Sequence, residues 1–573
     1  MTNEVAIELT LGELSLDELT ALTRHAEATD LDLVVLTGED ALLDPWTTAV
    51  WLAGRTERIR IATDRPGSPL PAVAAKALAS AEALSGGRVL VADPALVRLP
   101  ARSTDDVDGH APAVHAARRE RRLTHRRPGI AYDDLPASLA ATAVEPGDPA
   151  YRGASSTYLR GGSPGLVLRP RSATEVAHAV AFARGHRDLP LGVRSGGHGV
   201  SGRSTNDGGL VVDVGALDEV EVIDEEHHLV RIGPGARWKD VAAVLDGHGW
   251  AIGSGDYGGV GVGGLATAGG IGFLSRKHGL TIDQLRAVEL VLADGSRVRA
   301  SREERPDLFW AVRGAGANLG IVTAFEFEAS EIDLVGWAQL VVVVPDLADG
   351  LRRFGEVASG APRDTTVFLV TGRPQRDQAV LQLYGMVESA DPEVVIERLT
   401  PFAEIGALAR QQVVLARYAD VMAMAADVGP EGHRGYGEPV TRSAYAPRLT
   451  PELAADTAAL LDTGLVHFFQ LRTMGGAIAD VPADATAFAH RTPDFQVTAM
   501  GADRTGLDAA WDALAPHFDG LYLSFETDPR PERLHDAFPP PTLARLREIK
   551  RRYDPENLFR DNFNIDPQEG PHD

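Results

Sequence analysis

Two glycine-rich tracts carry the residue types most suited to chemistry in this 573-residue chain. Arg194–Gly199 reads Arg-Ser-Gly-Gly-His-Gly, and Gly253–Leu265 is continued by Gly269–Gly272. Glycine is needed where backbone amides approach a ligand closely or where φ is positive. Successive exposed N–H groups make an anion-binding nest suited to a pyrophosphate. One such tract is usually a tight turn, but two tracts roughly 60 residues apart, with a histidine inside the first, favour a dinucleotide site.

Regular elements on both sides of these tracts must position them. A helix is predicted over Ser172–Arg184, with short apolar strands at Leu191–Val193 and Leu210–Val214. From about Ile332 the pattern changes to long strands separated by helices, which indicates an antiparallel sheet with helices over one face. These long strands are Trp337–Val344, Thr366–Thr371 and Ala379–Val387.

Ordered motifs make the chain from about Gly147 to Pro567 resemble the FAD-linked oxidases of the berberine bridge enzyme family, within the vanillyl-alcohol oxidase superfamily. They include the Val193–His198 segment, and they continue along most of this range. The others are Gly233–Ala236, Asp294-Gly295, Asp307–Gly314, Asn318–Thr323 and Tyr553–Phe559.

The resemblance implies an α+β fold with a two-part PCMH-type FAD-binding domain, formed by residues 131–330 and 515–573. Residues 331–514 would form the antiparallel-sheet substrate domain, which roofs the isoalloxazine ring. The family position for a covalent histidyl–flavin bond falls on His198. A lone histidine is otherwise most often held in a core or turn by local hydrogen bonds, so covalent attachment of FAD here rests on the resemblance.

The resemblance also assigns a set of cofactor-binding positions in the glycine-rich tracts, in the Asn318–Thr323 motif and near the C-terminus. They are Arg194, Ser195, Gly196, Gly197, His198, Gly199, Tyr257, Val260, Gly261, Gly263, Gly264, Gly269, Gly320, Val322, Asn562 and Asn564.

Two positions depart from the family pattern around the flavin. Many relatives hold a second flavin bond through cysteine at the position of Tyr257, but this chain has no cysteine, so we expect a monocovalent flavin. The family's small residue that affects oxygen access matches Val260, which is compatible with an oxidase and also with ordinary strand packing.

A third departure affects the catalytic base. Relatives often use a tyrosine near flavin N5, where this chain has Phe525, preceded by Ser524 in place of asparagine. Strand alternation places Tyr522 on the face opposite Phe525. It also groups His467 with Phe469 and Leu471, and Gln470 with Phe468 and Arg472. The candidates for the catalytic group are Tyr522, Gln470, His467 and Tyr384.

The function expected from this resemblance is an FAD-dependent oxidase. It would take a hydride from a small, natural-product-like substrate and reduce O2 to H2O2. Because the usual base is missing, a dehydrogenase, a cyclase or a monooxygenase with a non-standard base stays open, as does a redox-inactive flavoprotein scaffold.

Residues 1–100 alternate strands and helices, with helices predicted at Leu16–Ala28, Pro45–Ala53 and Pro71–Leu84. Motifs such as Thr56–Ala62 make this segment resemble the beginning of a bacterial luciferase-like monooxygenase. The segment is long enough for only about half of that family's barrel. A partial (β/α) barrel leaves an open sheet edge. We therefore expect a structural unit, with a homodimer through it as one possibility. The arginine-rich segment 101–130 is expected to be a basic linker or a solvated helix.

Composition narrows the function classes. The chain has 56 Lys+Arg against 81 Asp+Glu, a formal net charge of -25, which argues against a nucleic-acid partner. No apolar run approaches the roughly 18–20 residues of a membrane span, and no secretory signal is apparent, so we expect a cytoplasmic protein without a membrane partner. No metal-binding motif is present, and no metal is expected.

Overall fold

The computed structural model describes residues 5–38, 45–56, 58–63, 89–92, 96–374, 378–425, 440–528 and 530–569. The chain forms two compact units. Unit 1 comprises residues 1–128 and 144–154, and unit 2 comprises residues 129–143 and 155–573. Among the described residues, no helix combines the length and apolarity that crossing a lipid bilayer requires. The expected helix Pro71–Leu84 lies outside the described residues.

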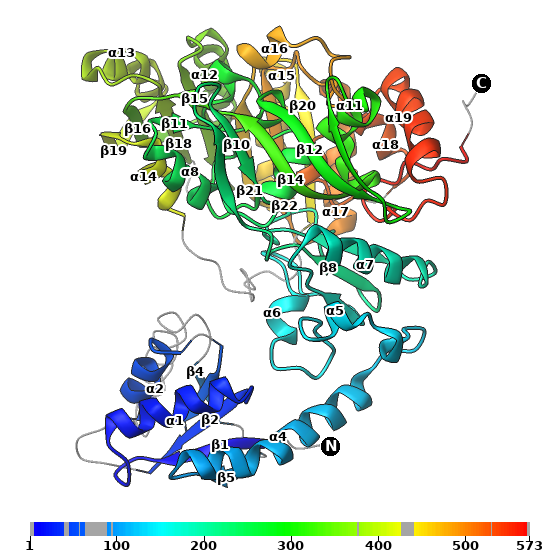
Figure 1. Ribbon diagram of the computed structural model, residues 1–573. Coiled ribbons are helices and arrows are strands. Elements are labelled where there is room, and N and C mark those ends of the chain that lie inside the picture. The colour runs from blue at the N-terminus through cyan, green and yellow to red at the C-terminus, as the bar shows by residue number, and fades with distance from the viewer. Residues whose placement is uncertain are drawn as a thin grey trace. The chain divides into compact units, whose positions relative to one another are not determined.

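Unit 1 is built on a five-stranded parallel sheet (Figure 1). Helix α1 spans Leu16–Ala28, the range that its apolar spacing predicts, and begins with a capping box between Ser15 and Glu18. Helix α2 spans Pro45–Ala53. The parallel sheet and its helices agree with the expected β/α unit, although the last strand pairs with the first strand and not with the fourth, as it would in a barrel. In spatial order the strands are β4 (Val89–Val91), β3 (Arg60–Thr63), β2 (Leu33–Thr37), β1 (Val5–Thr10) and β5 (Val97–Pro100).

Of the two forms expected for the arginine-rich segment, a linker or a solvated helix, the structure shows a helix: α4 (Thr104–His125) has 22 residues and is part of unit 1. Val107 and Val114 of α4 are buried in the apolar core of the unit. Its arginines find acidic partners within the same unit: Arg122 pairs with Asp148, whose side chain is 2% exposed. The charge run is therefore one face of a packed helix.

The first part of unit 2 contains two small sheets. A parallel sheet has the order β6 (Leu166–Leu168), β8 (Leu210–Asp213), β7 (Leu191–Arg194), and helix α7 (Ala173–Arg184) packs on it. An antiparallel sheet follows, with the order β13-β12-β14-β10-β9. Its strands are β9 (Val220–Asp224), β10 (Leu229–Ile232), β12 (Leu285–Leu292), β13 (Arg297–Ser301) and β14 (Gly320–Glu328).

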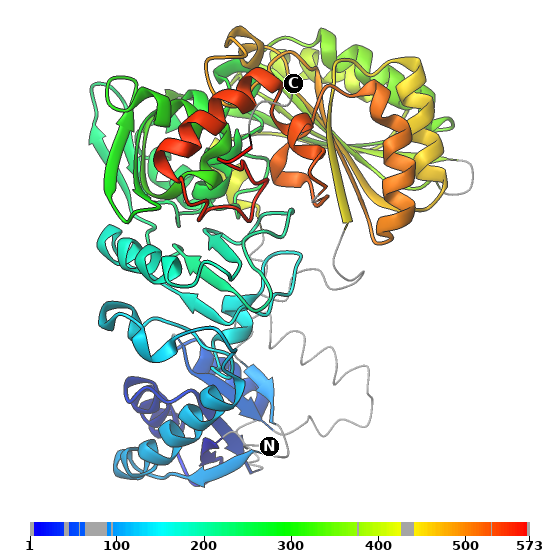
Figure 2. The same ribbon diagram turned by 90° about the vertical axis from the view of Figure 1, so that its right-hand side faces the viewer.

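A seven-stranded antiparallel sheet forms the rest of unit 2, in the order β19-β16-β18-β17-β21-β22-β20. Helices cover one face of this sheet (Figure 2). Phe354, Leu399 and Trp511 belong to the apolar core between the helices and the sheet. This is the arrangement expected from the sequence. The strands are β16 (Val335–Val344), β17 (Thr365–Thr371), β18 (Ala379–Val387), β19 (Ala407–Ala416), β20 (Val440–Ala446), β21 (Val466–Thr473) and β22 (Phe495–Gly501). The covering helices are α12 (Leu347–Gly360), α13 (Pro392–Ala403), α15 (Pro451–Asp462) and α17 (Arg504–Leu514).

The C-terminal segment returns to the first part of unit 2. Helix α19 (Pro540–Tyr553) buries Leu543 and Leu546 in the same core as helix α11 (Pro306–Ala315) and strands β10 and β14. Lys550 is fully buried, and its ammonium donates to Asp554 and to the carbonyl oxygens of Asn318 and Phe559, each at 2.7 Å. Residues more than 200 positions apart thus meet beside the glycine-rich region.

Candidate functional site

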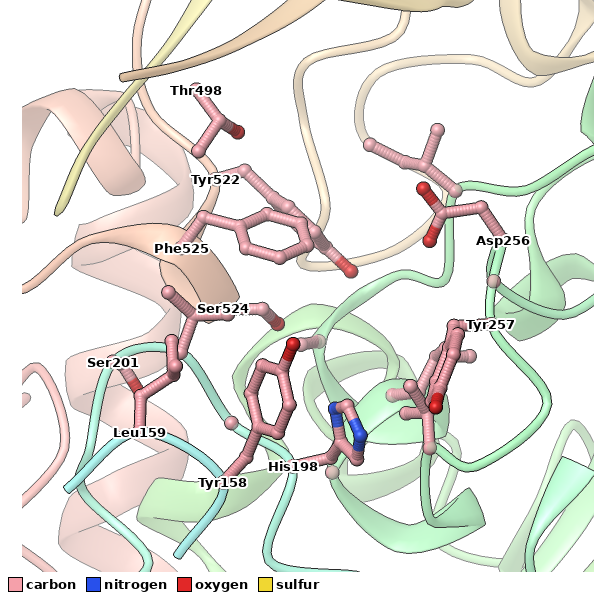
Figure 3. Close-up of a pocket in the computed structure, with 18 of the residues that line it drawn as sticks. Tyr158, Leu159, His198, Ser201, Asp256, Tyr257, Thr498, Tyr522, Ser524 and Phe525 are labelled. Carbon is pink, nitrogen blue, oxygen red and sulfur yellow. The ribbon is translucent and has the colours of Figure 1, made fainter. Parts of the chain in front are cut away.

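A large cavity of about 1860 Å³ lies between the glycine-rich tracts and the uncovered face of the seven-stranded sheet. Figure 3 shows part of its wall, where loop residues such as His198 and Tyr257 face Tyr522 and Phe525. Strand residues such as Trp337 and Tyr384 complete the wall from the side of the sheet. Apolar, aromatic and a few polar groups therefore converge on one space, as is typical of a cofactor and substrate site.

The two glycine-rich tracts touch backbone to backbone. A Cβ atom added to Gly261 would lie 2.3 Å from the amide nitrogen of Gly196, and one added to Gly196 would lie 2.6 Å from the amide nitrogen of Gly261. The Gly263 amide donates to Ser195 Oγ at 3.3 Å. Gly264, in contrast, faces open space beside the cavity. Side chains are thus excluded where the two tracts meet, and the glycine at 264 leaves the cavity beside them open, which fits the cradle of a bound ligand.

His198 is held between two aromatic rings. Its ring stacks on Tyr158 with centroids 4.2 Å apart, and the Tyr257 ring lies 5.2 Å away on the other side (Figure 3). Its Nε2 atom is buried and has no hydrogen-bond partner among the residues that the structure describes. Burial, followed by the charge of Arg237, lowers the pKa of His198 to about 4. The imidazole is therefore neutral at pH 7, and a buried ring nitrogen without a partner is unusual enough to suggest a missing one.

Most of the positions expected to bind the cofactor line this cavity, but three do not. Arg194, Gly269 and Asn564 lie outside the cavity wall. The Asn564 Oδ1 atom is buried without a hydrogen-bond partner in the described part of the chain. The expected positions that do line the cavity are Ser195, Gly196, Gly197, His198, Gly199, Tyr257, Val260, Gly261, Gly263, Gly264, Gly320, Val322 and Asn562.

The segment with the missing tyrosine differs from the expected strand. Residues Leu523–Phe525 form a 3₁₀ helix, so Tyr522 and Phe525 are one turn apart and face the same cavity, with ring centroids 5.4 Å apart. The expectation that they lie on opposite faces is wrong. The Tyr522 hydroxyl accepts a hydrogen bond from the Gly270 amide at 3.1 Å, and burial raises its pKa. The ring of Tyr522 is therefore a cavity wall whose hydroxyl already has a backbone partner.

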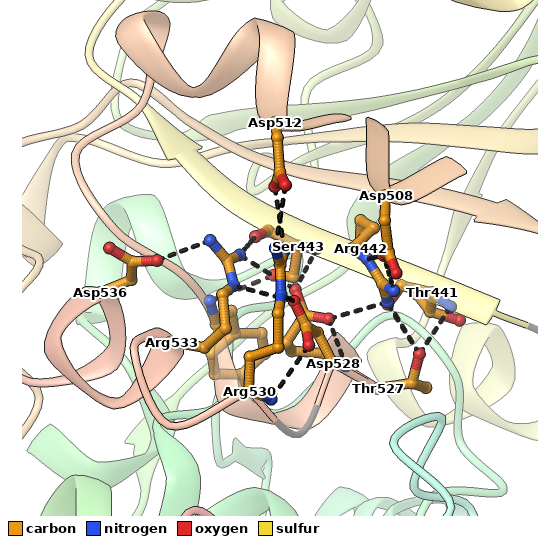
Figure 4. A network of polar contacts seen from close by, with 12 residues as sticks. Thr441, Arg442, Ser443, Asp508, Asp512, Thr527, Asp528, Arg530, Arg533 and Asp536 are labelled. Carbon is orange, nitrogen blue, oxygen red and sulfur yellow. Dashed lines mark hydrogen bonds and ion pairs between the residues drawn. The ribbon is translucent and has the colours of Figure 1, made fainter. Parts of the chain in front are cut away.

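Buried ion pairs hold this turn in place (Figure 4). Glu526, which is fully buried, accepts hydrogen bonds from Arg442 at 3.2 Å, from Arg533 at 3.2 Å and from the Ser443 amide at 3.0 Å. Arg442 and Ser443 belong to β20. The network therefore ties the turn that carries Tyr522 and Phe525 to the edge of the seven-stranded sheet.

Strand β21 presents Phe468, Gln470 and Arg472 to the cavity and buries Phe469 and Leu471 in the core, as alternation predicts. His467 is the exception, because the pairing of β21 with β22 shifts register between Val466 and Phe468. This bulge turns His467 away from the core face, where the sequence placed it, and onto the rim of the cavity. On β18, Tyr384 lines the wall and donates its hydroxyl to Gln382 at 3.0 Å.

Asp256 is a site residue that the sequence analysis missed. It lies in the second glycine-rich tract beside Tyr257 and lines the cavity (Figure 3). Its Oδ2 atom accepts hydrogen bonds from Gln470 Nε2 at 3.0 Å and from Arg472 Nε at 3.1 Å. The donors come from positions more than 200 residues later, so no local pattern could have indicated this contact.

Comparison with known proteins connects this geometry to a family. The FAD binding domain family matches residues 164–301, and the berberine and berberine-like family matches residues 538–566. (R)-6-hydroxynicotine oxidase from Paenarthrobacter nicotinovorans is 30% identical over 436 residues, which cover 71% of this chain and 92% of that protein. The chain belongs to the berberine bridge enzyme-like FAD-linked oxidases. FAD is its cofactor, and the chain is an FAD-dependent oxidoreductase.

Solved structures of this family share the fold. The crystal structure of 6-hydroxy-D-nicotine oxidase from Arthrobacter nicotinovorans superposes with a TM-score of 0.67 at 27% identity, covering 76% of this chain and all of that one. Glucooligosaccharide oxidase from Acremonium strictum, described with a 6-S-cysteinyl, 8α-N1-histidyl FAD, superposes with a TM-score of 0.65 at 24% identity. The superposition covers 76% of this chain and 99% of glucooligosaccharide oxidase. At this identity, the likeness shows a shared fold and nothing more.

The N-terminal residues of this FAD-linked oxidase match a second family. Residues 1–92 match the luciferase-like monooxygenases, which agrees with the parallel sheet of unit 1. The structural or dimerising role expected for this segment stays a prediction.

Proposed function

We propose that this chain is an oxidase that removes a hydride from a small organic substrate and reduces O2 to H2O2. The observation that carries the proposal is the large cavity in which both glycine-rich tracts face the uncovered surface of the seven-stranded sheet. When bound, FAD supplies the chemistry: it accepts two electrons as a hydride and passes them to O2. The chain's own residues bind and orient the substrate and exchange its proton.

His198 is proposed as the covalent attachment point of FAD, in a monocovalent linkage. The neutral imidazole and the buried, unpartnered Nε2 atom support this role, because a ring nitrogen without a proton can act as a nucleophile. The rings of Tyr158 and Tyr257 restrict the orientation of the imidazole. Since the chain contains no cysteine, a second thioether link of the kind named for glucooligosaccharide oxidase cannot form.

The face of the sheet over the cavity supports a neutral substrate with polar groups on an aromatic or alicyclic frame. Trp337, Phe368 and Tyr384 offer ring surfaces, while Gln339 and Gln382 offer amides. These side chains can stack on a flat molecule and hydrogen-bond its hydroxyl groups without adding a net charge. Such a wall suits natural-product-like alcohols and phenols.

The proposed oxidase predicts two measurable outcomes for the holoenzyme. Anaerobic mixing with a panel of alcohols and amines should bleach the flavin with at least one of them. Mixing the reduced protein with air should then restore the colour and release one H2O2 per flavin, measured with a peroxidase-coupled dye. Bleaching followed by slow reoxidation without peroxide would instead identify a dehydrogenase, and a flavin that no compound in the panel bleaches would identify a scaffold.

A further inference from the structure

The carboxylate of Asp256 is held at one oxygen and open at the other. Its Oδ2 atom accepts hydrogen bonds from Gln470 and from Arg472 Nε at 3.1 Å, and it forms an ion pair with Arg472 Nη2 at 3.0 Å. Its Oδ1 atom has no hydrogen-bond partner among the described residues, and 22% of the side chain is exposed within the wall of the cavity. One oxygen is thus fixed by the protein, and the other is available to a ligand in the cavity.

Arg472, one of the two donors to Asp256, is itself held by a buried partner. Arg472 Nη1 donates to Gln496 Oε1 at 3.0 Å, and Gln496 is fully buried on β22. The Gln496 amide nitrogen in turn donates to Thr498 Oγ1 at 2.9 Å. The Arg472 guanidinium also lies 4.3 Å from the ring centroid of Phe525, the residue at the family's tyrosine position. The fixed carboxylate therefore belongs to the same corner of the cavity as Phe525.

Four other candidate proton acceptors on the cavity wall are occupied or remote. Tyr522 Oη accepts from the Gly270 amide, and Tyr384 Oη donates to Gln382. His467 lies on the exposed rim. Asp561, the other carboxylate among the cavity residues that the structure describes, accepts from the Leu191 amide at 2.8 Å, in the first part of the FAD-binding region.

We propose that Asp256 is the proton acceptor of the oxidation and that Gln470 and Arg472 are its positioning residues. This inference rests on the proposed oxidase function. The substrate O–H or N–H bond breaks, and its proton moves to Asp256 Oδ1. The adjacent C–H bond breaks with its electron pair leaving as a hydride to FAD, so that a C=O or C=N bond forms. The carboxyl group then releases its proton to water, and O2 takes up the two electrons with two protons as H2O2.

Asp256→Asn tests the proton transfer directly, because it keeps the size of the side chain and removes the basic oxygen. Anaerobic stopped-flow reduction of the variant should be slower by about 100-fold or more, the lower end of the usual gain from general base catalysis. Flavin content, read from the absorbance spectrum, should be unchanged. Asp218→Asn makes the same change at an exposed position and should leave the reduction rate within twofold of the parent. Equal reduction rates in the Asp256→Asn variant and the parent would overturn the proposal.

Gln470→Leu tests the positioning role. Loss of one hydrogen bond to the carboxylate should lower kcat by about tenfold. KM should stay within a factor of two, because the side chain holds Asp256 and not the substrate. A change confined to KM would show that Gln470 binds substrate instead, and would contradict its assignment as a positioning residue.

Binding of 4-nitrophenol gives a readout that needs no turnover, because its neutral and ionised forms differ in colour. A carboxylate at Oδ1 accepts the phenol O–H and disfavours phenolate, so the parent holoenzyme should bind the neutral form. In Asp256→Asn the amide can donate, and the ionised form should gain at least tenfold in relative affinity. No binding, or the same colour change in both proteins, would overturn the proposal. If the parent fails to make peroxide while this difference persists, the oxidase function fails and the assignment of Asp256 as an acceptor stands.

Discussion

Replacing His198 by alanine is expected to abolish covalent attachment of FAD without abolishing FAD binding. Acid precipitation of the parent should leave the yellow colour with the polypeptide, whereas the same treatment of the variant should release all of it into the supernatant. The reason is local: His198 presents a neutral imidazole with a buried, unpartnered Nε2 atom at the cavity, while the glycine-rich cradle around it does not involve the imidazole. Mass spectrometry of the intact chain measures the loss as a drop by the mass of the flavin.

The stability of the His198→Ala protein should then depend on free FAD. A ligand that binds only the folded state stabilises it by about 2.7 kcal/mol when its concentration is 100 times its Kd. The thermal midpoint of the variant should therefore rise with added FAD, whereas that of the covalently loaded parent should not. His535→Ala, at an exposed histidine of helix α18 (Arg533–Ala537), should keep the parent's covalent yield. Colour that remains with the precipitated His198→Ala polypeptide would show that another residue carries the flavin.

The sequence was most informative where motif, local pattern and backbone geometry agree. The helix over Leu16–Ala28 was predicted from its apolar spacing alone, and the antiparallel sheet with helices on one face followed from the pattern of long strands. The glycines at 196 and 261 stand out in the sequence as parts of two glycine-rich tracts, and the structure shows that a Cβ atom at either position would clash with the backbone of the other tract. The two tracts are distant in sequence, but each can be recognised separately from its own run of glycines.

The predictions failed where tertiary contacts override the local pattern. The alternation around Leu523–Phe525 predicts a strand, but these residues form a 3₁₀ helix. The next residue, Glu526, pairs with Arg442 and accepts a hydrogen bond from the Ser443 amide, both on β20. His467 follows a bulge that exists only because of the pairing between β21 and β22. Asp256 could not be singled out, since its partners are more than 200 residues away. The sequence does not decide between a linker and a solvated helix for the arginines of α4, because their acidic partners, such as Asp148, are separated from them in sequence.

The largest stability effect that we expect in this protein concerns Glu526, which pairs with Arg442 in the polar network of Figure 4. Glu526→Gln removes the negative charge that faces Arg442, whose side chain is fully buried. Removing one partner of a buried ion pair leaves an uncompensated charge and costs about 3–5 kcal/mol. Asp508 also pairs with Arg442 and limits the loss, so the lower end of this range is expected. The measurement is urea unfolding of the holoenzyme, followed by the flavin fluorescence of unit 2.

Glu532→Gln provides the matched control, because it makes the same chemical change six residues later at an exposed position. Its unfolding free energy should stay within about 0.5 kcal/mol of the parent, as for most surface substitutions. Glu526→Gln should also slow flavin reduction, since the turn with Tyr522 and Phe525 depends on the same contacts. Equal urea midpoints for the two variants would mean that the hydrogen bonds from the Ser443 and Asp528 amides hold the turn without the charge, and that the ion pairs add nothing to the stability of unit 2.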